Sequence, residues 1–175
     1  MTTPESELVD FQAAYQRFVD AMNGVPTEAL TYLFPSDDYS LGGLVTHVNA
    51  ILRRYGRVLD AILADPTGEI DAQSIDRDKD GENARSVEGL TAPERDAAMT
   101  TMAKLHDHVA ARLATLSEED WGRKTPVIFG GSEGQAYPTG AGEIKAWLTG
   151  HYDEHVPHVA ELLQGWRSGV QPTIR

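Results

Sequence analysis

Histidine is the residue type in this sequence best suited to metal chemistry, and three of the six histidines lie in GHYDEHVPHVAEL, residues 150–162. Successive residues of an α-helix advance by about 100°, so His151 and His155 project from one face, one turn apart. That is the spacing that two ligands of a single metal ion need. His158, seven residues after His151, falls close to the same face. Taken alone, the segment is compatible with metal ligands and equally with polar residues that share a helix.

The face that carries these histidines is the one expected to be buried, because apolar residues continue it in both directions: Ile144, Leu148, Val159 and Leu162. Earlier in the chain, His47 interrupts an apolar stripe in the same way, between Leu44 and Ile51. A lone buried imidazole usually satisfies both ring nitrogens with nearby carbonyl or hydroxyl groups. Several core-facing imidazoles from two helices are harder to satisfy like that, and a shared divalent ion explains them economically.

The elements that must position these residues are helices. Four segments have amphipathic helical periodicity: residues 5–23, 40–64, 91–116 and 140–166. Ser40 is suited to cap the second helix, and Thr91 with Glu94 matches a capping box at the third. Four such helices bury their apolar stripes most economically as a four-helix bundle. We therefore predict an all-α fold, a single domain over residues 1–175 with a long irregular connection before the last helix.

The connections between the predicted helices differ in composition. Residues 24–39 should contain a turn and a short helical piece, whereas the acidic and polar residues 65–90 should form a solvated loop. Residues 120–139 are rich in glycine and proline but retain apolar side chains, so this irregular segment should pack over one end of the bundle. Four of its residues are candidates for a substrate lid: Trp121, Arg123, Phe129 and Tyr137.

The composition excludes several classes of partner. The chain has 175 residues and a formal net charge of -12, which disfavours binding to nucleic acid or to anionic membranes. Neither a membrane-spanning run nor a secretory signal is recognisable, so a cytoplasmic location is expected. Cysteine is absent from the sequence, so a metal must be held by histidine, carboxylate or carbonyl groups. Any reactive thiolate must then come from a small-molecule cosubstrate.

His47 in LGGLVTHVNAILRRYGRVLDAIL and the histidine pair in WLTGHYDEHVPHVAEL resemble the DinB/YfiT-like superfamily. The resemblance spans residues 5–167, although its specific part is only the three histidines in their helical settings. Proteins of this superfamily are four-helix bundles that hold a divalent metal between one histidine of helix two and a His-x-x-x-His pair on the last long helix. The resemblance implies that His47, His151 and His155 are the ligands, with one to three coordination positions left open for water or substrate. It also implies that the chain could form a homodimer.

Further polar residues near the predicted ligands have alternative roles. His158 is extra to the family pattern and could orient a ligand, shuttle protons or be moved to the surface by Pro157, which lacks an amide hydrogen. Glu154 and Asp153 are about 100° or more from the metal face, so we expect them at the surface or as partners of a histidine. His106, at the edge of the third stripe, either reaches the site or packs there partly exposed.

Three neutral imidazoles suit Zn²⁺ or Ni²⁺, with Fe²⁺ as a further candidate, and leave an open, electrophilic site. Such a metal lowers the pKa of a bound water or thiol and polarises a carbonyl group of a small-molecule substrate. Two enzymatic functions follow: hydrolysis, or transfer and isomerisation with a low-molecular-weight thiol, as in superfamily members that use mycothiol or bacillithiol. The alternative is a non-catalytic metal-binding or stress-related protein whose metal is structural. No general base is evident beside the ligands.

The stretch DRDKDGENARSVE, residues 76–88, reproduces the start of a calcium-binding loop, with aspartates at alternate positions followed by Gly81. The twelfth position, which should supply a bidentate carboxylate, is Val87, and Glu88 follows one residue late. The flanking helices of the motif are not predicted either. A solvated acidic loop is therefore the preferred interpretation of Asp76 to Glu88.

Overall fold

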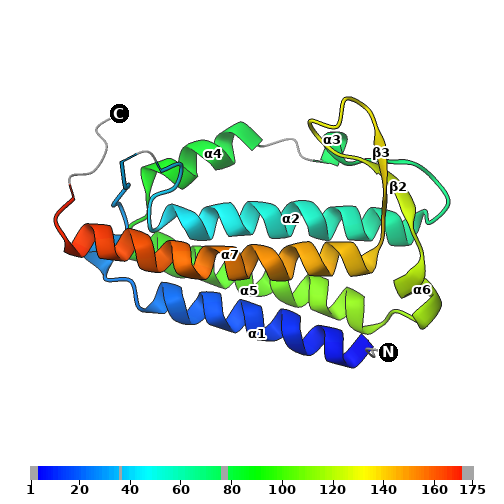
Figure 1. Cartoon of the computed structure of the whole chain (residues 1–175), viewed down its shortest axis with the longest axis horizontal. Coiled ribbons are helices and arrows are strands. Elements are labelled where there is room, and N and C mark those ends of the chain that lie inside the picture. The colour runs from blue at the N-terminus through cyan, green and yellow to red at the C-terminus, as the bar shows by residue number, and fades with distance from the viewer. Residues whose placement is uncertain (1–3, 36, 76–78, 171–175) are drawn as a thin grey trace.

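The structure is a computed structural model that describes residues 4–35, 37–75 and 79–170, with only the backbone described for residues 4–7 and 79–83. Its described part is mostly helical and includes a small three-stranded sheet (Figure 1). The four long helices are α1 (Pro4–Asn23), α2 (Gly43–Ala64), α5 (Ala92–Ala114) and α7 (Ala141–Arg167). The predominantly helical fold is thus as predicted, and the small sheet is a feature that the prediction did not include. No helix in the described ranges has the length and apolar character to cross a membrane.

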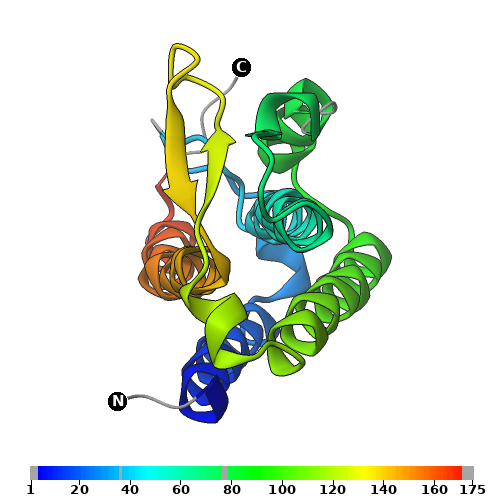
Figure 2. The same ribbon diagram turned by 90° about the vertical axis from the view of Figure 1, so that its right-hand side faces the viewer.

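The four long helices enclose a common apolar core (Figure 2). Helices α1 and α2 each pack against both α5 and α7. Side chains from all four stripes are fully buried there: Phe11, Phe18, Leu44, Leu59, Met102, Leu113 and Ile144. Each such burial contributes about 1.5–3 kcal/mol relative to leaving the side chain exposed. This packing holds α2 beside α7, and these are the two helices that carry the predicted metal ligands.

The helix starts follow their capping residues closely. The Ser40 hydroxyl accepts a hydrogen bond from the Gly43 amide at 3.0 Å, although α2 begins at Gly43, three residues later than predicted. At the start of α5 the Thr91 amide donates to the Glu94 carboxylate at 2.8 Å, as in the predicted capping box. The short helical piece predicted within residues 24–39 is a 3₁₀ turn at Thr27–Ala29.

The described residues within 65–90 are not the solvated loop that their composition predicted. They form β1 (Ile70–Asp71), α3 (Ala72–Ile75) and α4 (Lys79–Glu88), and α4 packs against α2. The Ser86 carbonyl accepts hydrogen bonds from the amide and the hydroxyl of Ser40, at 3.0 and 3.2 Å. Part of the calcium-like motif, residues 76–78, lies outside the described residues, and the rest is helical rather than a loop.

The connection before α7 is ordered rather than irregular. It contains α6 (Glu118–Gly122) and a hairpin of β2 (Thr125–Ile128) and β3 (Ala136–Thr139), and β1 pairs parallel with β2. Figure 1 places this hairpin at the end of the helices where α2 finishes and α7 begins. Gly131 and Gly134 in its turn have φ of 85° and 80°, which suits glycine. The composition of residues 120–139 did not predict the sheet, because one of its strands, β1, comes from a segment distant in sequence.

Candidate metal centre

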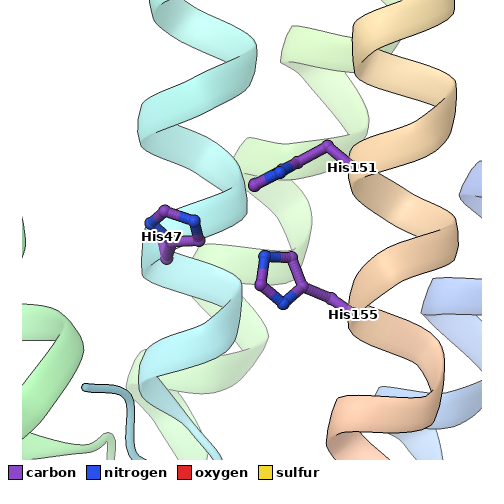
Figure 3. A group of neighbouring side chains, drawn as sticks. All are labelled: His47, His151 and His155. Atoms are coloured by element: carbon purple, nitrogen blue, oxygen red, sulfur yellow. The ribbon is translucent and has the colours of Figure 1, made fainter. Parts of the chain in front are cut away.

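The three histidines predicted as ligands converge between α2 and α7 (Figure 3). His47 projects from α2 toward His151 and His155, which lie one turn apart on α7. One ring nitrogen from each residue lies within 4.8 Å of the other two. The ring centroid of His47 is 4.9 Å from that of His151 and 5.1 Å from that of His155. The packing of the two helices therefore brings the three side chains together.

The electrostatic setting keeps these imidazoles neutral. Burial, followed by the adjacent imidazoles of His151 and His155, lowers the pKa of His47 to about 3. Burial likewise lowers the pKa of His151 and of His155 to about 4. The Nε2 atoms of His151 and His155 are buried and have no hydrogen-bond partner among the residues that the structure describes. Leaving a buried polar atom unsatisfied costs about 1–3 kcal/mol, and coordination of a divalent ion would remove that cost. The donor set therefore fits such an ion.

Tyr39, a loop residue outside the predicted site, covers this cluster. The ring of Tyr39 stacks on that of His47 at 4.3 Å between centroids and meets His155 edge-on at 6.0 Å. Burial raises the pKa of Tyr39, so its hydroxyl is protonated at neutral pH. The Tyr39 amide donates to Oδ1 of Asp37 at 3.0 Å. The sequence feature that could have identified Tyr39 is the aromatic and acidic stretch SDDYS, immediately before the helix that carries His47.

His158 lies next to the cluster and connects it to the same loop. Its Nδ1 is 3.3 Å from Nδ1 of His155, and its Nε2 is 2.8 Å from Oδ2 of Asp37. Helix α7 continues through Pro157 to Arg167 without moving His158 away from His155. These contacts therefore favour a role for His158 beside the predicted ligand His155 over a position at the surface.

A positive charge and an aromatic group also border the cluster. Arg54, seven residues after His47 on α2, contributes to the lowered pKa values of His47 and His151, after burial in each case. Two helical turns separate Arg54 from His47, and this spacing in the sequence indicates that both side chains share one face of α2. The rings of Tyr55, Phe129 and Trp147 contact one another at 5.5–6.3 Å between centroids. Because Trp147 is one turn before His151, this group lies along the same side of α7.

The residues proposed for the substrate lid lie in different settings. Phe129 belongs to the aromatic group just described, whereas Tyr137 is 45% exposed on β3. Arg123 forms ion pairs with Glu119 and Asp120 at 3.1 and 2.9 Å. Trp121 lies on α6 and is partly buried against the core. The lid role of all four residues stays a prediction.

Glu154 lies at the surface and His106 lies in the core. The Glu154 side chain is 74% exposed, and its carboxylate is 4.0 Å from Nδ1 of His151, which agrees with a surface location. His106 is fully buried rather than partly exposed, because aromatic side chains of α1 cover that edge of α5. Its Nε2 is 2.9 Å from Oε1 of Gln12 and its Nδ1 is 3.3 Å from the Tyr152 hydroxyl. These contacts support a structural role for His106.

Asp153 lies on the outer side of α7. Its carboxylate accepts hydrogen bonds from the Arg17 guanidinium at 2.7 and 3.0 Å, and both side chains are about half exposed. Asp153 therefore ties α7 to α1 at the surface, as its angular position on the helix indicated.

Comparison with known proteins gives the evolutionary context of this site. Residues 10–159, which include all three clustered histidines, match the DinB superfamily. The fold is similar to crystal structures of the mycothiol-dependent maleylpyruvate isomerase and of a histidine-to-alanine mutant of that enzyme, with TM-scores of 0.67 and 0.65. Both are 12% identical in sequence, with 90% of this chain and 61% of the isomerase chain covered. The chain thus spans about three fifths of the length of the isomerase.

No curated protein matches the sequence. The identity to the isomerase is low, so that likeness concerns the fold, whereas the family match rests on the sequence itself. Because this match extends over most of the chain, the protein belongs to the DinB superfamily.

Proposed function

We propose that the chain holds a divalent metal ion through His47, His151 and His155 and catalyses a thiol-dependent transfer or isomerisation of a small molecule. The observation that carries the proposal is the cluster of three neutral imidazoles, in which two buried Nε2 atoms have no hydrogen-bond partner within the described ranges. The fold shared with a mycothiol-dependent isomerase supports the thiol-dependent class. Zinc or nickel, and also ferrous iron, suit a site of nitrogen ligands. In this proposal the four long helices form a four-helix bundle within one domain over residues 1–175.

The chemistry supplied by the ion, when bound, is Lewis acidity: it lowers the pKa of a thiol and polarises a substrate carbonyl. The residues of the chain provide the rest. Arg54 places a positive charge beside the cluster and would attract an anionic substrate group. The protonated Tyr39 hydroxyl can donate a hydrogen bond, and the group of Tyr55, Phe129 and Trp147 can shield reactants from water. The thiol must be a cosubstrate, because the sequence contains no cysteine.

Metal analysis of purified variants tests the site. His47→Ala and His155→Ala should each abolish stoichiometric binding of zinc or nickel, because two imidazoles cannot replace the three-ligand set. His108→Ala is the matched control, since His108 is half exposed and pairs with Asp60 on the surface at 2.8 Å. Circular dichroism should show that each variant remains helical. Full metal occupancy in both ligand variants would contradict the assignment.

The reaction class is tested with the metal-loaded protein. Incubation with a low-molecular-weight thiol and an electrophile should give metal-dependent consumption of the thiol and formation of the thiol adduct. With a small unsaturated acid in place of the electrophile, the isomer of the acid should form and the thiol should be regenerated. Turnover of esters or amides without thiol would instead favour hydrolysis. A coordinatively saturated metal with no exchangeable water and no turnover would favour the non-catalytic alternative.

A further inference from the structure

Three side chains form a continuous polar connection from the loop before α2 to the candidate metal centre. Oδ2 of Asp37 is 2.8 Å from Nε2 of His158, and Nδ1 of His158 is 3.3 Å from Nδ1 of His155. The opposite nitrogen of His155, Nε2, is buried and has no hydrogen-bond partner in the described part of the chain. We propose that Asp37 and His158 are positioning residues that hold His155 in the tautomer and orientation that present Nε2 to the metal. This inference rests on the proposed function.

The direction of each hydrogen bond in this connection follows from the groups present. A carboxylate can only accept, so Nε2 of His158 must carry the hydrogen and donate to Asp37. When His155 binds the ion through Nε2, its Nδ1 carries the remaining hydrogen. Nδ1 of His155 then donates to Nδ1 of His158, which is left as an acceptor. Each of the two imidazoles thus has one donor and one acceptor nitrogen, with no conflict along the chain of contacts.

Asp37 requires a carboxylate because both of its oxygens accept hydrogen bonds. Oδ1 accepts from the Tyr39 amide at 3.0 Å while Oδ2 faces His158. The same side chain therefore keeps the Tyr39 ring against His47 and orients His158 toward His155. An asparagine has a single acceptor oxygen and could satisfy only one of these two donors. Its amide donor would meet another donor at Nε2 of His158.

The expected consequence is a change in metal binding rather than in folding. Groups that orient a ligating histidine through its second nitrogen raise its basicity, and their loss typically weakens metal affinity by about 10- to 100-fold. Asp37→Asn and His158→Phe should therefore retain helical structure but bind Zn²⁺ about 10- to 100-fold more weakly. In the Co²⁺-loaded protein, both should also change the visible absorption spectrum, because His155 is less well aligned.

The matched control is Asp38→Asn, which removes the same charge from the adjacent, exposed position of the same loop. Its Zn²⁺ affinity, measured by competition with a chromophoric chelator, should equal that of the original protein. Nitrogen NMR of the Zn²⁺-loaded original protein provides a test that needs no variant. It should show the hydrogen on Nδ1 of His155 and on Nε2 of His158.

Two results would overturn this inference alone: Zn²⁺ affinity and Co²⁺ spectra in Asp37→Asn and His158→Phe that match the original protein, or Zn²⁺ coordination through Nδ1 of His155. Failure of the original protein to bind Zn²⁺, Co²⁺ or Ni²⁺ would overturn the proposed function together with the inference. The metal affinity of the unsubstituted protein therefore distinguishes failure of this inference from failure of the proposed function.

Discussion

At the scale of single residues, His106 and His155 are both buried histidines, yet their ring nitrogens have different surroundings. His106 has Gln12 and Tyr152 as partners and lies between the rings of Phe11 and Tyr15. Nε2 of His155 has no hydrogen-bond partner among the described residues, and the ring that carries it is directed toward the other imidazoles of the cluster. The supply of hydrogen-bond partners, rather than burial, thus separates a core histidine from a candidate ligand.

The buried His106 should make folding sensitive to acid. Burial lowers the pKa of His106 to about 4 from the value of 6.5 for the exposed group. The folded state then binds fewer protons than the unfolded state between these values, so the stability from this residue is complete above pH 6.5 and is lost as pH falls toward 4. His106→Gln should reduce the pH slope of the unfolding free energy by up to about 1.4 kcal/mol per pH unit. Urea unfolding of the metal-free proteins across this range measures the slope, and identical slopes would contradict the prediction.

At the scale of elements, the start of α2 is fixed by a close backbone approach. A Cβ atom on Gly43 would lie 1.7 Å from the carbonyl oxygen of Ser86 in α4. Glycine is therefore required for α4 to pack at this position, while Ser40 hydrogen-bonds both segments. The start of α2 is also where the Asp37–Tyr39 loop joins the helix that carries His47. The position at which α2 begins therefore helps to determine how the loop and His47 are arranged at the site.

Two glycine-to-alanine variants should have opposite effects on stability. Gly43→Ala should lower the unfolding free energy by about 1–3 kcal/mol, because α4 must move away from α2. Gly142→Ala is the control, since a Cβ atom there meets none of the described residues within 4 Å and the residue is helical. That substitution should raise the unfolding free energy by about 0.5–1 kcal/mol through lower entropy of the unfolded chain. Chemical denaturation measures both, and a stable Gly43→Ala variant would show that the two segments do not approach as closely.

At the scale of the whole molecule, the three-histidine cluster exists only when α2 and α7 are packed together. His47 and the pair of His151 and His155 are far apart in sequence, so the unfolded chain does not present the same ligand set. A ligand that binds only the folded state stabilises it by about 2.7 kcal/mol at a concentration one hundred times its Kd. Metal binding and folding are therefore coupled through the packing of these helices.

Thermal denaturation should reveal this coupling. Addition of Zn²⁺ or Ni²⁺ in excess should raise the Tm of the original protein by several degrees, and a chelator should reverse the shift. His151→Ala should show no such rise, because it removes one of the two buried Nε2 atoms that have no hydrogen-bond partner in the part of the chain that the structure describes. An equal rise in this variant would place metal binding elsewhere in the molecule.

The four long helices, the capping box at Thr91 and the histidine faces of two helices were predictable from the sequence alone, because these features depend on local periodicity and neighbouring residues. The sequence also restricted metal ligands to groups other than thiolates. The tertiary structure decided the pairing of β1 with β2, the core role of His106 and the presence of Asp37 and Tyr39 at the cluster. These features depend on which helices are adjacent and how each is rotated. Contacts between distant segments of the chain determine that arrangement, and the periodicity of a single segment does not contain it.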